Sequence, residues 1–376
     1  MIPPGEGPGG PDRPDPAAED LAPPLVPARI PDPASSDDPA APVQGDVPAA
    51  PDADGAIAAS RPGASTFTID GRAAPALFVI GWLGSLFGLA LIVIGVLSGG
   101  GAATIAMLMA GLALLAIGLI CAAGSQGIER RAAGRMPYQG PSPFLVFAAA
   151  IPISVLAGAI IGLLVTAVGL DVQGPVGQFL SVLILAVVYL GLIRLLVVDA
   201  GALTWAEMGL RRLDGRALMQ MGGGALWAVP VIVVTVPISA ILISLLRVTP
   251  DSPLPPAGEN TGFALQLLAG AIIAPFGEEM LFRGLATTAW VRSLGVRRGI
   301  VRAALVFALA HIIGVAGSTF GETAGLAVIG FATRVPVALA LGWLFVRNGS
   351  IWSSFGLHAA FNAILLILAE VAIRST

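Results

Sequence analysis

Three ionisable residues lie close together in an apolar stretch in the last third of the chain. Glu278, Glu279 and Arg283 fall within residues 277–284. On a helix Glu279 and Arg283 are neighbours and can form an ion pair, whereas Glu278 points about 100° away. A charge inside a membrane span costs about 2.5–3.5 kcal/mol on insertion scales, so such residues are expected to have a function. Glu278, a carboxylate without a helical cation partner, is therefore the candidate general base.

The two histidines of the chain also lie in apolar stretches. His311 follows Phe307 by one helical turn, and His358 precedes Asn362 by one turn. A lone histidine in a helix bundle is more often a hydrogen-bonded packing residue than a catalyst. Here both histidines accompany a glutamate on a third stretch, which favours one shared intramembrane site.

Several other chemistries are excluded by residues that the sequence lacks. The chain has 20 arginines and no lysine, so no Walker lysine, Schiff-base lysine or Ser–Lys pair is possible. No HExxH motif occurs, which excludes that class of metalloprotease. The aspartates fall in loops or at span ends: Asp171, Asp199, Asp214 and Asp251. Glutamate and histidine remain, acting on water directly or through a metal. Glu278, His311 and His358 could also form a zinc site with an open fourth position.

The elements that position these residues are expected to be transmembrane helices. Hydrophobic residues make up 56% of the chain and charged residues 11%, against about 25% charged in a soluble domain. The predicted fold class is all-α, a polytopic bundle of eight or nine spans, because helices satisfy their backbone hydrogen bonds within lipid. The apolar runs predict spans at about 76–98, 102–124, 143–168, 178–198, 225–246, 263–290, 301–318, 323–346 and 351–373.

Arginines are distributed unevenly between alternate loops. One set of short loops holds 11 arginines, and the other holds only Arg247, with Arg374 near the C-terminus. The positive-inside rule places the arginine-rich loops and the N-terminus in the cytoplasm and the C-terminus outside. The expected location is the plasma (inner) membrane of a bacterium. Residues 200–220 are interpreted as an amphipathic helix on the cytoplasmic interface.

With this orientation, the three candidate residues fall at one depth. Counted from the cytoplasmic ends of their spans, Glu278, His311 and His358 lie roughly 12–18 Å deep. Three unrelated polar residues on separate helices would not usually coincide in depth. The common layer therefore favours a single site.

The first part of the chain has a different composition. Residues 1–62 contain 16 of the 30 prolines, and 11 acidic residues against three arginines. Such a segment buries too little apolar surface to offset the entropy of ordering. We expect residues 1–70 to form a disordered, acidic, Pro/Ala-rich cytoplasmic tail, and we expect no nucleic-acid partner.

The ionisable residues form three motifs with a fixed order and spacing. They are Glu278-Glu279 with Arg283, Phe307 with His311, and His358 with Asn362. These resemble the EExxxR, FxxxH and HxxxN motifs of the CPBP family of intramembrane proteases (CAAX protease and bacteriocin-processing, also called Abi). The resemblance covers about residues 200–365, including Leu210-Arg211-Arg212, which is similar to an interfacial segment of that family.

The resemblance implies a role for each matching residue. Glu278 and His311 would activate the attacking water, and His358 and Asn362 would stabilise the tetrahedral oxyanion. The residues that would support the site structurally are Glu279, Arg283 and Phe307. The motifs do not settle whether a divalent metal such as zinc takes part.

We predict an intramembrane endopeptidase that hydrolyses a peptide bond of a membrane-associated protein or peptide through a Glu/His-activated water. Residues 71–199 would form N-terminal transmembrane helices and residues 200–376 the protease core. Two alternatives remain, namely a polytopic transporter with a Glu/His/Arg relay and a non-catalytic family member acting as a scaffold or immunity protein. Arg334, near mid-depth in the eighth expected span, pairs either with a site carboxylate or with an unrelated partner.

Overall fold

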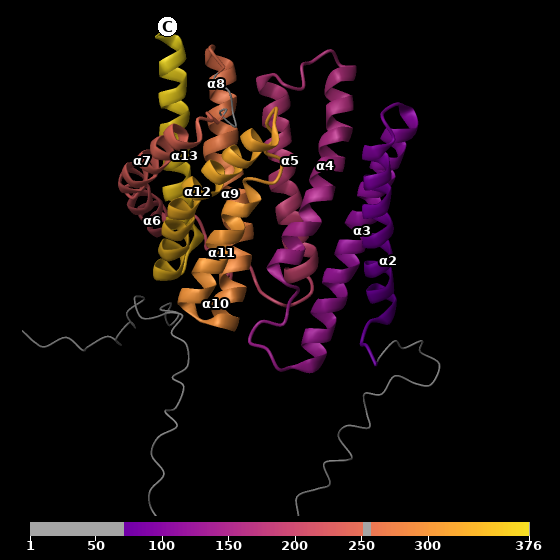
Figure 1. The fold of residues 1–376 in the computed structure, drawn as a ribbon. Helices are drawn as coiled ribbons and strands as arrows, with labels where there is room; N and C mark the ends of the chain where they lie inside the picture. The colour runs from indigo at the N-terminus through magenta and orange to yellow at the C-terminus, as the bar shows by residue number, and fades with distance from the viewer. Residues whose placement is uncertain (1–70, 251–256, 376) are drawn as a thin grey trace, which may run out of the picture. The chain divides into compact units, whose positions relative to one another are not determined.

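The structure is a computed structural model that describes residues 71–250 and 257–375. The predicted disordered tail at 1–70 lies outside the described residues. Within them, every regular element is a helix, as expected (Figure 1). The helices, with π-helical segments written η, are α2 (Pro75–Leu97), α3 (Ala102–Ala133), α4 (Pro143–Ala167), α5 (Pro175–Ile193), η2 (Arg194–Val198), α6 (Gly215–Ala225), α7 (Ala228–Leu246), α8 (Asn260–Leu267), η3 (Leu268–Ile273), α9 (Ala274–Glu278), η4 (Glu279–Thr287), α10 (Thr288–Leu294), α11 (Val296–Ala310), α12 (Phe320–Asn348) and α13 (Ile351–Arg374).

Eight helical stretches in the described part of the chain are long and apolar enough to cross a membrane. They are Pro75–Leu97, Ala102–Ala133, Pro143–Ala167, Pro175–Val198, Gly215–Leu246, Asn260–Leu294, Phe320–Asn348 and Ile351–Arg374. Large apolar side chains are exposed along their outer surfaces, with Trp82 at 65%, Leu163 at 70% and Val233 at 65%. Such surfaces suit contact with lipid rather than water. The chain is an integral membrane protein built as an all-α bundle, as predicted.

The predicted bounds of the seventh span, 301–318, are wrong. Helix α11 has 15 residues and ends at Ala310, a length of about 22 Å that does not cross a 30 Å core. Its C-cap is His311, and the chain then turns through Gly314, whose φ of +139° favours glycine. Residues beyond the cap are apolar, so hydropathy alone extends the span too far.

The interpretation of residues 200–220 as one amphipathic helix is also wrong. Helix α6 begins only at Gly215, after Asp214 accepts a hydrogen bond from the Ala217 backbone N–H as its N-cap. The preceding residues form turns, because Gly201 and Gly209 both adopt positive φ values that interrupt a helix. The segment instead crosses beneath the start of α13, where the Gly209 carbonyl accepts a hydrogen bond from the Ile351 N–H at 3.1 Å.

One continuous helical rod, from α8 to α10, carries the first motif. It contains two π-helical segments, η3 and η4, on either side of Pro275. Proline has no N–H to donate and its ring crowds the carbonyl four residues earlier, so a wider turn before it relieves the clash. In η4 the Thr287 hydroxyl donates to the Phe282 carbonyl at 2.8 Å, five residues earlier. The wide turns keep the rod continuous while changing the direction in which its side chains point.

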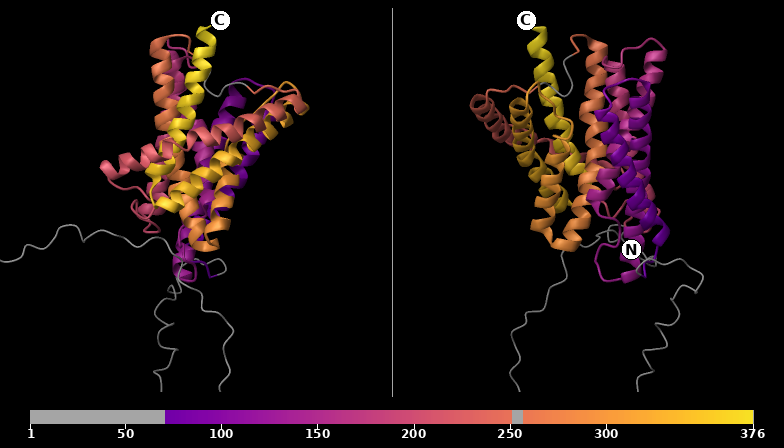
Figure 2. Two further views of the ribbon diagram at one scale, coloured as in Figure 1. Left: turned by 90° about the vertical axis from the view of Figure 1, so that its left-hand side faces the viewer. Right: turned by 45° about the vertical axis from the view of Figure 1, so that its right-hand side comes forward.

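The remaining helices surround this rod. Helices α2 and α3 pack as an antiparallel pair, and α4 and α5 run beside them (Figure 1). Helices α7 and α12 lie side by side and cross the other helices obliquely (Figures 1 and 2). Helix α13 contacts η3, η4 and α12. The rod, α11 and α13 are thereby held together by α5 on one side and by α7 and α12 on the other.

Orientation in the membrane can be tested with single cysteines, because Cys121 is the only cysteine of the chain. Leu170 and Leu294 are exposed by 47% and 37%, and their turns lie at opposite ends of the bundle (Figure 1). In a Cys121→Ala background, we expect an impermeant maleimide applied to intact cells to label Leu170→Cys and not Leu294→Cys. Labelling of Leu294→Cys alone would contradict the arginine-based orientation.

Candidate active site

A buried carboxylate lies at the centre of the candidate site. Glu279 Oε1 is 3.1 Å from Arg283 Nη1, and the two side chains are 0% and 2% exposed. The same oxygen lies 2.9 Å from His358 Nδ1. The helical ion pair is the one expected from the sequence, whereas the contact with His358 depends on how α13 packs against η4 and was not foreseen. One carboxylate oxygen thus joins the first and third motifs.

The second glutamate faces both histidines. Glu278 Oε2 lies 3.7 Å from His311 Nε2 and 3.7 Å from His358 Nε2. This separation is too long for a direct hydrogen bond and short enough for one bridging water. Glu278 Oε2 is itself buried and makes no hydrogen bond to any residue of 71–250 or 257–375. The structure therefore brings together the three residues that the sequence assigned to one site.

The partners of the other ring nitrogens determine which atoms the histidines present. His358 Nδ1 faces the carboxylate of Glu279, and His311 Nδ1 lies 2.8 Å from the Phe307 carbonyl oxygen. Both partners are acceptors, so each Nδ1 carries the hydrogen and each neutral ring presents a lone pair at Nε2. Two imidazole lone pairs and one carboxylate oxygen therefore converge on the space beside Glu278.

Phe307 is the ring around which these groups pack. It is 2% exposed, and its centroid lies 4.4 Å from the His311 ring and 5.8 Å from the His358 ring. The Arg283 guanidinium carbon is 4.4 Å from the same centroid, a distance at which a cation is attracted to a ring face. Phe307 therefore packs against the Arg283 guanidinium and both histidine rings.

The end of α11 explains the position of His311. As the C-cap residue, His311 follows the last turn, whose carbonyl groups lack helical partners. Its Nδ1 satisfies one of them, the Phe307 carbonyl, as basic side chains at helix ends often do. The hydrogen bond between His311 and the Phe307 carbonyl therefore both caps α11 and orients the imidazole ring.

Asn362 lies on α13 one turn after His358, and its amide is directed at the rod eight residues before Glu278. Its Nδ2 donates a hydrogen bond of 2.8 Å to the Gly270 carbonyl in η3. This bond joins α13 to the rod one turn beyond His358, and it uses one of the two hydrogens of the amide. The π-helical carbonyl that receives it could not be identified from the sequence.

Interactions at the start of α13 fix the position of this helix, and therefore that of His358. Ser350 caps the helix, its hydroxyl accepting from the Trp352 N–H at 3.3 Å. The Trp352 indole Nε1 donates to the Arg211 carbonyl at 2.9 Å. Gly209, with φ of +78°, allows this approach, because a Cβ there would lie 2.8 Å from the Phe345 ring. The segment before α6 therefore anchors the helix that carries His358.

The contact between α5 and α9 has two features that the sequence analysis missed. Tyr189 is 7% exposed and lies close enough to Glu278 to interact with it electrostatically. Gly277 allows this closeness, since a Cβ there would lie 3.0 Å from the Cα and Cβ of Ala186. Gly277 directly precedes the glutamate pair, which was the only available signal of a close helix contact.

Arg334 does not form an ion pair with any carboxylate of the described residues. Its Nη1 donates to the Gly330 carbonyl at 3.2 Å and lies 3.5 Å from the Thr333 hydroxyl oxygen. The guanidinium nevertheless interacts electrostatically with Glu278 and His311. Of the two expected alternatives, the ion pair with a site carboxylate is absent from the described residues, and the observed partners, Gly330 and Thr333, are unrelated to the site.

A zinc site would use the same atoms of Glu278, His311 and His358. Ligands held tetrahedrally at about 2.1 Å from zinc lie about 3.4 Å apart, slightly less than the 3.7 Å separations at Glu278. Among the described residues, no group of three or more His, Cys, Asp or Glu is arranged to hold a metal ion. A zinc site made by Glu278, His311 and His358 stays a prediction.

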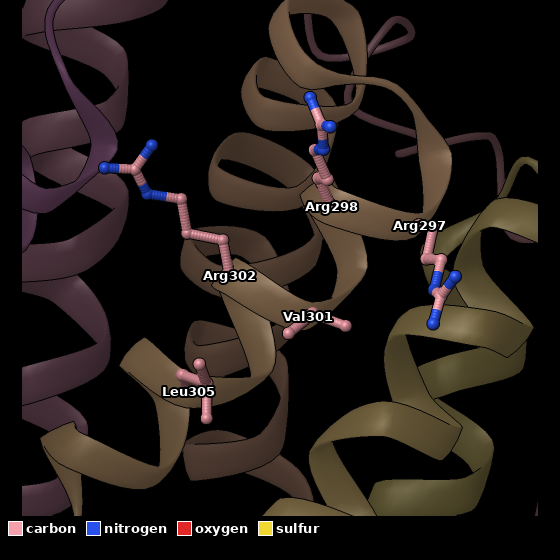
Figure 3. Close-up of a pocket in the computed structure, with 5 residues that line it drawn as sticks. All are labelled: Arg297, Arg298, Val301, Arg302 and Leu305. Carbon is pink, nitrogen blue, oxygen red and sulfur yellow. The ribbon is translucent and has the colours of Figure 1, made fainter.

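A separate hollow on the surface of α11 is unlike the candidate site. Its lining residues are Arg297, Arg298, Val301, Arg302 and Leu305. Figure 3 shows the three guanidinium groups pointing in different directions from one helix. They do not converge on a common ligand, and all three belong to the first two turns of α11.

The fold and the site define a polytopic membrane protein with a buried Glu/His cluster. Residues 260–364 match a family described as Rce1-like, "Type II CAAX prenyl endopeptidase Rce1-like". This match begins at α8, ends within α13 and includes all three motifs, and it confirms the resemblance to the CAAX protease family. It supports an intramembrane CAAX-type endopeptidase as the general class of activity. Neither the curated proteins nor the solved structures include a significant match to the chain.

The two adjacent glutamates are expected to differ in their effect on stability. Glu279→Gln would leave the Arg283 cation buried without a carboxylate and should lower the free energy of unfolding by about 3–5 kcal/mol. Glu278→Gln removes no ion pair with a fixed cation and should change it by less than about 1 kcal/mol. Thermal unfolding of both variants in one detergent measures the difference. Equal losses of stability would show that the Glu279–Arg283 pair does not support the site.

Proposed function

We propose that the protein hydrolyses a peptide bond of a membrane-associated protein or peptide, using a water activated by Glu278 and His311. The observation that carries the proposal is the convergence of Glu278 Oε2 and both histidine Nε2 atoms, with separations of 3.7 Å. Two of these atoms, Glu278 Oε2 and His311 Nε2, suit a water molecule, which donates two hydrogens and retains a lone pair for attack. His358 Nε2, which faces the same space, is left for a different role. The match to a CAAX prenyl endopeptidase family agrees with this reaction class.

The proposed reaction proceeds in two steps. Glu278 accepts a proton from the water as the oxygen attacks the carbonyl carbon, which forms a tetrahedral intermediate. The peptide C–N bond then breaks, and the proton passes to the leaving amine nitrogen, giving a new carboxylate and a new amine. His311, whose Nε2 also faces the water, assists the proton transfer.

His358 and Asn362 are proposed to stabilise the oxyanion. When His358 carries a proton on Nε2, it presents a donor, and its contact with Glu279 stabilises that charged form. Asn362 keeps one amide hydrogen beyond the one given to Gly270. Donors of this kind act where charge develops, in a site from which water is largely excluded. Glu279, Arg283 and Phe307 are positioning residues that hold these donors.

The substrate is proposed to reach the site from the lipid bilayer. The description of the matched family makes a prenylated peptide the first probe to use. A proteomic comparison of membranes containing the wild-type protein or Glu278→Gln would identify the natural substrate as a peptide whose cleavage disappears. In the orientation that the arginines predict, this cleavage would occur nearer the cytoplasmic side of the membrane.

Substitution of the proposed base tests catalysis separately from folding. Glu278→Gln should lower kcat on a fluorogenic prenylated peptide by about 10²–10⁴-fold, because a general base contributes that much. His311→Ala and His358→Ala should also lose cleavage, and combining either with Glu278→Gln should add little, since all serve one step. Cleavage rate and melting temperature are measured on the same purified proteins.

A matched control is Glu207→Gln, a carboxylate that pairs with Arg292 at 3.0 Å outside the site. It should leave kcat nearly unchanged. Full activity of Glu278→Gln would overturn the assignment of the base. Loss of activity on chelation, with recovery on adding zinc, would instead make Glu278 and the histidines metal ligands.

A further inference from the structure

Arg334 is a cation in the interior of a span whose role the proposed mechanism does not use. It lies at the middle of α12, half-buried, beside the end of α11. A Cβ at Gly330, one turn earlier, would lie 3.2 Å from Ile312 Cγ2 and 4.0 Å from Arg334 Nη1. Ile312 directly follows His311 in the chain. The guanidinium is thus placed at the boundary between α12 and the candidate site.

The hydrogen bonds of Arg334 leave much of the guanidinium free. Nη1 contacts the Gly330 carbonyl and the Thr333 hydroxyl, both on the same helix. Nε and Nη2 make no hydrogen bond to any residue that the structure describes, and no described carboxylate lies within ion-pair distance. Arg283, by contrast, is fully buried and forms an ion pair with Glu279 at 3.1 Å, although its Nη1 and Nη2 also make no hydrogen bond to the described residues.

This difference between the two arginines has an energetic meaning. An arginine in the interior of a span is costly unless it pairs or faces a polar cavity. Arg283 is paired, so its role is structural. Arg334 keeps two adjacent donor groups unused and lies within electrostatic range of Glu278 and His311. A planar guanidinium with free donors is well suited to bind a carboxylate through two parallel hydrogen bonds.

We propose that Arg334 binds a carboxylate of the peptide substrate and thereby selects peptides with an anionic group close to the scissile bond. This assignment rests on the proposed endopeptidase function, because it places that group beside the activated water. The carboxylate could be the C-terminal carboxylate of the peptide or an acidic side chain. Both present the same two oxygens to the guanidinium, and an experiment can separate them.

Charge compensation is the competing explanation for Arg334. In that role the cation would stabilise the charge of Glu278 and would contact no substrate. Substitution of Arg334 would then affect the binding of all peptides alike, whatever their charge, and would have no effect once glutamine replaces Glu278. Direct binding instead predicts that the effect depends on the presence of one particular carboxylate, and this difference can be measured.

The experiment uses the full-length chain in lipid nanodiscs with Glu278→Gln, so that probes bind without being cleaved. Four fluorescent probes are made from one prenylated peptide that has a single glutamate near its C-terminus. They combine a free or amidated C-terminus with glutamate or glutamine, and their Kd values are measured by fluorescence anisotropy. The same four are measured with Arg334→Gln and Arg334→Lys added, and with Arg297→Gln as an exposed control.

The expected result is that amidation of one of the two carboxylates weakens binding by about ten-fold or more. Arg334→Gln should abolish that difference while leaving the fully amidated probe unchanged, Arg334→Lys should retain part of it, and Arg297→Gln should retain all of it. The carboxylate whose amidation matters identifies the source of the anion. Equal binding of the four probes, an equal effect or no effect of Arg334→Gln on all four, or no binding at all would overturn the assignment. Cleavage by the chain with native Glu278 separately tests the endopeptidase function.

Discussion

The buried carboxylate of Glu279 is the interaction on which the rest of the site depends. It lies between the Arg283 guanidinium and His358 Nδ1, at 3.1 and 2.9 Å, with no exposed surface. A charge in that position is tolerable only because a second charge and a ring N–H face it. The same contact orients His358 so that its other nitrogen faces Glu278. Stability of the helix rod and geometry of the candidate catalytic groups are therefore coupled through one oxygen atom.

The helices around this carboxylate have irregularities where the site requires them. π-Helical turns flank Pro275 and the glutamate pair, and such turns are frequent at functional sites. Helix α11 ends just before His311, whose side chain caps the last turn through a hydrogen bond with the Phe307 carbonyl. Gly277 brings α5 within contact of the rod. Each of these irregularities brings a polar side chain to the site, and a regular helix of full length would direct that side chain elsewhere.

Motif spacing predicted the ion pair between Glu279 and Arg283, because residues four positions apart on a helix share one face. The all-α membrane fold followed from composition. The contact between Glu279 and His358 could not be predicted, since it depends on the packing of α13 against η4. The length of α11 was missed because the apolar residues after His311 extend the hydropathy signal past the point where Gly314 turns the chain. The roles of the site residues, the membrane orientation and the order of the tail remain predictions.

The central claim is that Glu279 orients His358 in addition to neutralising Arg283. The double variant Glu279→Gln/Arg283→Met separates these two roles, because it removes both buried charges and leaves His358 without its carboxylate. We expect the melting temperature of the double variant to recover relative to Glu279→Gln alone. Cleavage of the prenylated probe should stay at least about ten-fold below wild type, as expected when a histidine loses the partner that fixes its tautomer. A double variant that cleaves at the wild-type rate would contradict the account.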